Sequence, residues 1–305
     1  MRSNPIILRC LAVLLAFCIL QIQPLNARVE PSRGFNMFSA QEEVQAGQQS
    51  AAQVARQLPV LPDSDPVSVY VQRLGQQLAA HAPGEKWPYS FHVVNQKEIN
   101  AFALPGGPVF VNVGTIQAAD NEAELAGVIA HEISHVVQRH GTRAASKQMA
   151  AQLPLAILGG VMGQGALSQM AQMGLSFGVG SYFLKNSRKA ESEADLLGTD
   201  IMYDSGFNPR AMSDFFTKLE KEGSVGRGPQ FLSDHPDPGN RAQAVAKEVS
   251  TLPRKSSYRT DSAEFANVKQ RVGSMKPLTA QEIAQRQASS TNATTGVIRK
   301  PVITT

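Results

Sequence analysis

Apolar residues in the first part of the chain recur at the spacing of amphipathic helices. Residues 36–60 and 65–82 both show this periodicity, and in the second segment Tyr70, Leu74 and Leu78 are four residues apart. Positions four apart lie on one face of an α-helix, so each segment can bury one side against a core. The pattern therefore predicts two helices at the start of the folded chain.

A change of pattern after residue 88 predicts a small sheet. Residues 89–95 (YSFHVVN) alternate loosely and are rich in residues that favour strands. Residues 100–114 (NAFALPGGPVFVNVG) contain a Pro-Gly-Gly turn followed by a second strand-like stretch. Gly106 and Gly107 would allow another backbone to approach closely, although a turn alone also explains them.

The next segment is predicted to be a helix that carries two histidines. Asn121 and Glu124 have the spacing of a capping box, and Gly141 provides a C-terminal stop. The sequence HEISH stands between them at residues 131–135. The apolar residues at spacings of three and four are Leu125, Val128, Ile129, Ile133, Val136 and Val137. These neighbours would leave the histidines half buried.

Residues 148–184 contain no charged side chain. Glutamines and glycines interrupt the apolar run, so no stretch of about 18 apolar residues remains to span a bilayer. We interpret the segment as a buried or lid-like pair of helices, with a transmembrane hairpin or shallow membrane contact as the alternatives.

The second half of the chain is predicted to be helical, with a polar tail. Helical periodicity returns in four segments, at residues 187–206, 209–222, 235–249 and 261–275. From about residue 277 the chain has few large apolar residues, which is typical of a disordered tail. The pattern as a whole predicts a mainly helical α+β protein, with one domain over residues 28–255 and a C-terminal helix and tail over residues 256–305.

Composition excludes one class of function. The chain has 305 residues, enough to bury a sizeable core, and a formal net charge of +4. Its basic residues form no stripe with interleaved aromatic residues, so we expect no nucleic-acid partner.

Residues 1–27 have the pattern of a secretory signal peptide. Arg2 and Arg9 give a positive start, residues 10–20 form a short apolar block, and Ala27 provides a small residue for cleavage. An uncleaved anchor and a lipoprotein signal are the alternatives.

The cysteines agree with export of a protein that lacks disulfides. Both of them, Cys10 and Cys18, lie within the predicted signal peptide, and Cys18 would be the lipidated residue of a lipoprotein. Export without disulfides suggests the periplasm, and association with the outer membrane stays open.

The HEISH motif has the geometry of a metal site. Positions i and i+4 of a helix differ by about 40° around the axis, so His131 and His135 project from one face. Two imidazoles there can bind one ion, while Glu132 is turned by about 100° and can contact a water without being a ligand. The alternative is a pair of surface histidines, but buried imidazoles need partners, and a metal provides one.

A third ligand does not follow closely in the sequence. His140 is one residue short of the spacing that one class of zinc peptidases uses, and a continuous helix would direct it away from His131. We expect His140 to interact with the negative end of the helix dipole instead. No Asp or Glu occurs between Glu132 and Glu191, so a glutamate about 20 residues downstream is also excluded.

The first carboxylate after the motif lies in the sequence ESEAD. Glu191 and Asp195 share a helical face, whereas Glu193 is directed elsewhere. We predict Glu191 as the third zinc ligand and Asp195 as a carboxylate that orients a ligating histidine. The alternative is a set of solvated acids that pair with Arg188 and Lys189.

Four motifs in this order resemble the peptidase family that includes the CaaX prenyl proteases and the periplasmic β-barrel assembly-enhancing protease. They are NAFALPGGPVFVNVG, HEISH, ESEAD and the HP-x-x-x-x-R pattern formed by His235, Pro236 and Arg241. The resemblance covers roughly residues 40–250. It departs from the prenyl proteases, which have many transmembrane helices, and from the assembly-enhancing protease, which continues into helical repeats. The chain is similar to a short, exported, peptidase-only member.

The resemblance implies a zinc endopeptidase domain of the zincin (gluzincin) type. Its single zinc ion would have His131, His135 and Glu191 as ligands, with Glu132 as the catalytic base. Three protein ligands leave one coordination position for water, as a catalytic site requires. The segment 100–114 would be an edge strand whose residues Asn100, Ala101, Phe102 and Ala103 bind extended substrate through backbone hydrogen bonds.

The last motif offers two further candidate residues. His235 is predicted either to donate to the oxyanion of the reaction or to sit on the zinc as a reversible plug. The alternative is a loop histidine that caps the next helix. Arg241 could bind substrate carbonyls, fix Asp195, or be solvated.

Taken together, the sequence predicts a zinc-dependent endopeptidase of the cell envelope that cleaves misfolded or unassembled proteins. Unfolded polypeptides would be its partners, because an edge strand binds any extended chain. The alternatives are a chaperone-like envelope scaffold with latent protease activity and an inactive metal-binding protein, which the intact Glu132 disfavours.

Overall fold

The computed structural model of the chain describes residues 28, 30–31, 34–158, 187–223, 230–236 and 240–296. The predicted signal peptide lies outside the described residues, as does most of the charge-free segment 148–184. Among the residues that are described, no helix is both long and apolar enough to cross a bilayer.

Helices dominate the fold. The helices are α2 (Ala40–Gln57), α3 (Pro66–Ala79), α4 (Val113–Ala118), α5 (Glu122–Val137), α6 (His140–Leu158), α9 (Arg188–Asp204), α10 (Arg210–Gly223), α11 (Gln230–Asp234), α12 (Arg241–Thr251), α13 (Ala263–Ser274) and α14 (Ala280–Gly296). The strands are β1 (Ser90–Val94), β2 (Ala101–Ala103) and β3 (Pro108–Asn112). This arrangement confirms the predicted α+β class with a small sheet.

The three strands form one sheet with the order β1-β3-β2. β1 runs parallel to β3, and β2 runs antiparallel to β3, so β2 is an edge strand. The Pro-Gly-Gly turn between β2 and β3 forms as predicted. Gly106 there has φ +72°, and a Cβ atom on it would lie 2.5 Å from the Val44 Cα atom of α2. Glycine is therefore required both for the turn and for the close approach of α2.

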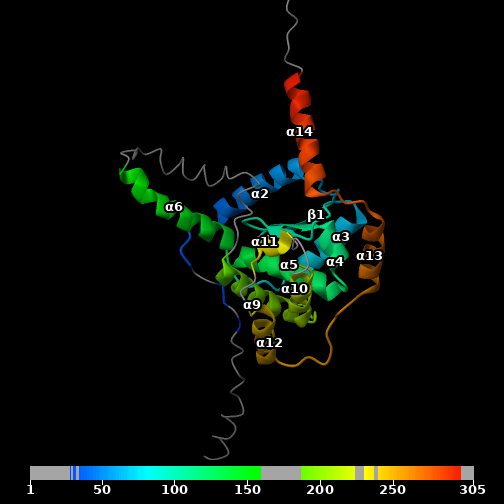
Figure 1. Cartoon of the computed structure of the whole chain (residues 1–305). Helices are drawn as coiled ribbons and strands as arrows, with labels where there is room; N and C mark the ends of the chain where they lie inside the picture. Colours follow the sequence, from blue (N-terminus) through cyan, green and yellow to red (C-terminus); the bar gives the residue numbers. More distant parts are fainter. Residues whose placement is uncertain are drawn as a thin grey trace, which may run out of the picture.

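Helix α5 is the central element of the molecule. Figure 1 shows it between the sheet and the group formed by α9, α10 and α12. Every residue of α5 is buried, and its contacts come from α3, β2, α9 and α10. A helix surrounded on all sides has to be apolar around most of its circumference. The exceptions, including His131 and Glu132, are therefore the polar groups whose partners have to be accounted for.

The C-terminal end of α5 differs from the prediction. The helix ends at Val137 rather than at Gly141, and Arg139 takes the left-handed conformation with φ 56°. Its guanidinium binds the buried carboxylate of Glu43 and the carbonyl of Phe38, with Nε–Oε1 at 2.7 Å for Glu43. These contacts compensate an unfavourable backbone conformation. A new helix, α6, begins at His140 and contains Gly141.

The chain after residue 277 was predicted to be a disordered tail, but residues Ala280–Gly296 form α14. Thr279 and Glu282 form a capping pair at its start, and Ile283 is buried. Alanine and glutamine favour helices, so a cap and one anchoring side chain provide a start for a largely exposed helix. Figure 1 shows α14 extending away from the body of the molecule.

The contact between α5 and α10 yields a test of this packing. A Cβ atom on Gly127 would lie 2.7 Å from the Met212 Cα atom, so Gly127→Ala has to push α10 away. We expect a loss of about 1–3 kcal/mol in the free energy of unfolding, measured by urea denaturation. Gly273→Ala is the control, because nothing lies within 4 Å of its added Cβ atom. Equal stability of the two variants would contradict the packing described.

Candidate metal centre

Four buried side chains direct one ligand atom each toward a common point. They are His131 and His135 of α5, Glu191 of α9 and His235 after α11, and their ligand atoms all lie within 4.8 Å of one another. The Nε2 atoms of His131 and His135 are 3.0 Å apart. Glu191 Oε2 lies 3.2 Å from His131 Nε2 and 3.2 Å from His235 Nδ1. The structure thus brings the three predicted ligands together and adds His235.

Close packing of α9 on α5 places Glu191 in this group. Ser187 caps α9 by accepting the N–H of Ala190, and Glu191 follows in the first turn. Two helix turns further on, Gly198 lets α9 and α5 approach each other. A Cβ atom at this position would lie 3.3 Å from the backbone nitrogen of His131. A carboxylate near a helix N-terminus also gains from the helix dipole.

The donor set fits a divalent metal. Nδ1 of His131 lies 3.0 Å from Asp195 Oδ1, which favours a proton on Nδ1 and leaves a lone pair on Nε2. In that tautomer Nε2 of His131 and Nε2 of His135 face each other at 3.0 Å, and the carboxylate oxygens of Glu191 lie 3.2 Å and 3.5 Å from these two nitrogens. Oε1 of Glu191 is buried without a hydrogen-bond partner among the described residues. A divalent cation can take the place of the proton that Glu191 and Asp195 stabilise on His131, and imidazole with carboxylate is a donor set that zinc uses.

The electrostatics of the group follow from its burial. Burial opposes charge on His131, but Asp195 and Glu191 outweigh it and raise the pKa of His131 to about 9. Burial likewise opposes ionisation of Glu191, but His235, His135 and His131 outweigh it and lower the pKa of Glu191. The pKa of His135 lies well below its usual value, because burial dominates there. The carboxylate of Glu191 is therefore ionised and suited to a cation.

Glu132 lies beside the four side chains without joining them. Its Oε1 atom is 3.4 Å from His235 Nε2, and the backbone N–H of Ala103 in β2 donates to its carboxylate. Burial raises the pKa of Glu132, although the neighbouring histidines and the Ala103 N–H act against this. A carboxyl group with a raised pKa next to a metal site is suited to exchange protons. Glu132 is thus adjacent to the metal group, and its role as a base stays a prediction.

Asp195 and Arg241 support the group from outside. Arg241 is only 3% exposed, and its Nε lies 2.6 Å from Asp195 Oδ2 and its second nitrogen 3.3 Å from Glu191 Oε2. The guanidinium also stacks on Phe216, with Cζ 4.1 Å from the ring centre. Of the alternatives for Arg241, the structure favours the one in which it fixes Asp195, and its burial excludes a solvated arginine.

The prediction for His140 is wrong. It is buried rather than directed at the helix dipole, and its Nδ1 lies 2.8 Å from Nδ1 of His135. Its Nε2 lies 3.0 Å from Oε2 of Glu193. The expectation assumed a continuous helix, whereas the left-handed turn at Arg139 brings His140 back under His135. No sequence pattern signals that turn, since arginine rarely adopts positive φ.

The predicted substrate strand, β2, lies directly beside Glu132. Phe102 pairs with Phe110 of β3, so the backbone groups of Ala101 and Ala103 are directed away from β3. The N–H of Ala101 is bound by the Asn100 side chain. Asn100 itself is buried, and its amide donates to Asp234 of α11 at 3.0 Å. Of the four predicted residues, Ala103 contacts Glu132 and the Asn100 side chain is turned toward the segment that carries His235, whereas the Phe102 ring stacks on Phe110. Their role in substrate binding stays a prediction.

That segment is held in place by Phe231. The Phe231 ring stacks on the His235 ring at 4.3 Å, and its backbone N–H donates to the carbonyl of Ile99. The predicted alternative, in which His235 caps the following helix, does not hold, because both of its ring nitrogens face buried carboxylates. The pKa of His235 is raised, since Glu191 and Glu132 outweigh the effect of burial.

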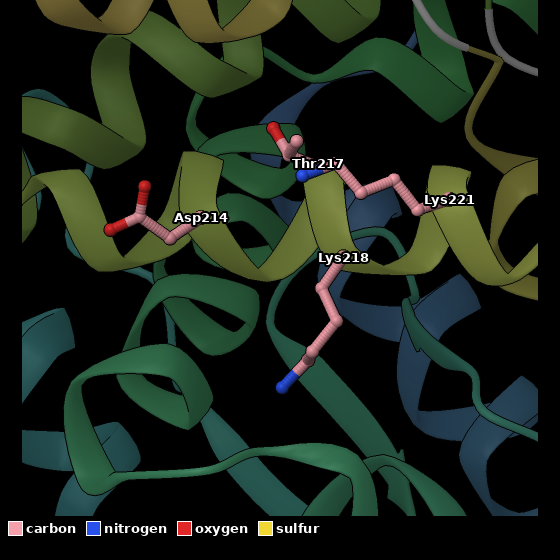
Figure 2. Close-up of a pocket in the computed structure, with 4 residues that line it drawn as sticks. All are labelled: Asp214, Thr217, Lys218 and Lys221. Carbon is pink, nitrogen blue, oxygen red and sulfur yellow. The ribbon is translucent and has the colours of Figure 1, made fainter.

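A hollow on the surface of α10 does not belong to this site. Asp214, Thr217, Lys218 and Lys221 line it, and Figure 2 shows them spread along α10. Nζ of Lys218 binds Asp120, Glu124 and the carbonyl of Ala118 at 2.7–2.8 Å. These contacts attach α10 to the segment between α4 and α5. The residues that line the hollow therefore have a structural role, and the hollow needs no ligand to explain it.

Comparison with known proteins agrees with this geometry. The model of peptidase family M48 matches residues 67–249, more than half of the chain. The chain belongs to peptidase family M48. Membership makes it a metalloprotease by class and confirms the predicted resemblance. The matched range contains all four side chains of the metal group, Glu132 and β2.

Relatives of known name share most of this range. The beta-barrel assembly-enhancing protease of Yersinia pestis is 34% identical over 240 residues, which are 77% of this chain and 49% of the relative. The protein of the same name from Escherichia coli is 35% identical over 67% of this chain and 43% of the relative. The mitochondrial metalloendopeptidase OMA1 of Schizosaccharomyces pombe is 31% identical over 75% of this chain and 66% of the relative. The chain thus spans about half the length of the bacterial relatives.

The burial of Arg241 yields a test of the electrostatics. Arg241→Ala leaves the buried carboxylate of Asp195 without its guanidinium partner and removes one contact of Glu191, so we expect a loss of about 3–5 kcal/mol in the unfolding free energy of the metal-free chain. Arg241→Lys should restore little of the lost unfolding free energy, because an ammonium group cannot contact both Glu191 and Asp195 while it stacks on Phe216. Arg210→Ala, at an exposed position of α10, is the control for urea denaturation. A loss below about 1 kcal/mol would contradict a supporting role.

Proposed function

We propose that the chain is a zinc-dependent endopeptidase of the cell envelope that cleaves misfolded or unassembled proteins. The observation that carries this proposal is the buried group of His131, His135 and Glu191 with Glu132 and the edge strand β2 beside it. Metal ligands, a proton-exchanging carboxylate and an open strand are the three parts that a peptide hydrolase of this kind needs.

Each residue has a defined role in the proposal. His131, His135 and Glu191 hold the zinc ion through Nε2, Nε2 and the carboxylate. The chemistry that zinc would supply there is polarisation of a peptide carbonyl and a lower pKa, about 7, for bound water. Glu132 accepts the proton of the attacking water and returns it to the amine that leaves. Burial supports this role, because it raises the pKa of the Glu132 carboxyl group and so makes it a better proton acceptor than an exposed glutamate.

The substrate would bind in extended form along β2. The register of β2 on β3 directs the carbonyls of Ala101 and Ala103 toward the open edge of the sheet. A peptide strand there receives main-chain hydrogen bonds whatever its side chains, which suits unfolded or locally opened proteins. Because the Ala103 N–H binds Glu132, the strand that receives substrate also positions the proposed base.

His235 supports a resting state in which the site is closed. Its Nδ1 lies with the metal ligands, and its Nε2 faces Glu132 at 3.4 Å. A histidine in this place would fill the fourth ligand position of the metal and would also contact the proposed base, Glu132. Of the two roles predicted for His235, we therefore propose the reversible plug. The same observation favours the second candidate function, an envelope scaffold whose protease activity is latent.

The proposed compartment and substrates rest on two further supports. The pattern of residues 1–27 is that of a signal peptide, which suggests the periplasm. Bacterial relatives are named for enhancing the assembly of β-barrels. Misassembled envelope polypeptides are therefore the proposed substrate class, and association with the outer membrane belongs to the same proposal.

The base assignment is tested by Glu132→Gln. We expect the variant to lose chelator-sensitive cleavage of casein, since an amide accepts no proton, while it still binds one zinc ion per chain. Glu191→Ala is the complementary variant, expected to lose zinc by elemental analysis as well as cleavage. Casein cleavage by Glu132→Gln at the wild-type rate would overturn the role of Glu132, and full zinc content of Glu191→Ala would overturn that of Glu191.

The plug is tested by His235→Ala. If His235 blocks the site, the variant cleaves casein faster than the wild-type chain at equal zinc content. If His235 instead stabilises the oxyanion, kcat falls by about 10²–10³-fold. Wild-type zinc content with no cleavage by either protein would favour the scaffold over the peptidase.

A further inference from the structure

We infer that His140 and Glu193 form a second set of positioning residues, which orient His135 as a metal ligand. The geometry is a chain of contacts. Nε2 of His135 faces the metal group, its Nδ1 lies 2.8 Å from Nδ1 of His140, and Nε2 of His140 lies 3.0 Å from Oε2 of Glu193. This inference rests on the proposed metal site and adds two residues to it.

The positions of the protons follow from these contacts. His135 can bind a metal through Nε2 only if Nε2 presents a lone pair, and the ring proton of the neutral imidazole then has to be on Nδ1. That N–H can donate only if Nδ1 of His140 is an acceptor. The proton of His140 is then on Nε2, where Glu193 accepts it. One arrangement of protons therefore satisfies every contact and also leaves the ligand atom free for the metal.

The two ligating histidines of α5 would then be held in the same way. Asp195 lies 3.0 Å from Nδ1 of His131 and so fixes the ring whose Nε2 faces the group. For His135 the carboxylate of Glu193 acts indirectly: it contacts the imidazole of His140, which in turn contacts His135. A carboxylate behind a ligating histidine fixes the tautomer and raises the basicity of the ligand. Both carboxylates come from α9, so a single helix would orient both rings.

The path of the backbone supports a specific placement of His140. A continuous helix would turn His140 by about 140° from His135, away from its ring. The left-handed residue Arg139, held by Glu43 of α2, instead reverses the chain so that His140 lies under His135. Strain of this kind persists where surrounding contacts fix it, and here it fixes the position of a side chain next to the site.

The test is the zinc affinity of the full chain, measured by competition with a chromophoric chelator. We expect His140→Ala to weaken zinc binding by about 10–100-fold, and Glu193→Gln to weaken it in the same direction by less. His140→Asn should restore most of the affinity, because its side-chain oxygen can accept where Nδ1 did. Lys189→Ala is the matched control, since it removes only an exposed ion pair with Glu193.

A second measurement separates positioning from a structural role. Nitrogen-15 NMR of the histidine rings in the zinc-loaded wild-type chain should show the proton on Nδ1 of His135 and on Nε2 of His140. A mere link between α6 and α9 would lower the melting temperature of metal-free His140→Ala without changing its zinc affinity. That result, or the opposite tautomer of His140, would overturn the inference.

The same measurements distinguish a failure of the inference from a failure of the proposed function. If the wild-type chain binds no stoichiometric zinc, the metal site and this inference both fall. If the wild-type chain binds zinc and His140→Ala binds it equally well, only the positioning role falls.

Discussion

The site depends on keeping two acidic side chains, Glu191 and Asp195, inside the protein. Burying a carboxylate is costly unless opposite charge and hydrogen bonds compensate it. Here the compensation comes from three elements, since His131 belongs to α5, His235 follows α11, and Arg241 begins α12. The acids of α9 therefore have partners only when these elements are assembled around it. This makes the metal group and the helical core one cooperative unit rather than a site added to a finished fold.

Much of the fold and of this group could be predicted from local patterns in the sequence. HEISH fixes the relative positions of His131, His135 and Glu132 because one helix carries them, and spacing alone places Asp195 on the same face as Glu191. The order of elements around them is equally local, since caps such as Asn121 and a Pro-Gly-Gly turn define their ends. What could not be predicted depends on contacts between segments far apart in sequence. The roles of Arg241 and Asn100 are settled by Asp195 and Asp234, whose positions only the packed structure provides.

His140 shows why other parts of the site could not be predicted from the sequence. Helical spacing gives the correct direction of a side chain only while the helix continues, and α5 ends at Val137. The break depends on Arg139, whose unfavourable backbone conformation is stabilised by Glu43, a residue almost 100 positions earlier. α14 is a related case, because a short capping sequence and a buried Ile283 outweighed a composition typical of disorder. In both places a tertiary contact determined a backbone conformation that local sequence propensity did not determine.

The proposed base, the proposed plug and the proposed substrate strand share one set of contacts, which has a consequence for how the site would open. Asn100, at the start of β2, binds Asp234, and the neighbouring Ile99 carbonyl binds Phe231, so the segment that carries His235 is attached to β2 itself. Glu132 is bound by the Ala103 N–H at the other end of that strand. Withdrawal of His235, as proposed, would therefore break contacts made by residues next to the open edge of β2. A peptide that pairs with β2 acts on the same short strand from its open side. In the proposed mechanism, occupation of the edge and withdrawal of the histidine would thus be linked through the three residues of β2.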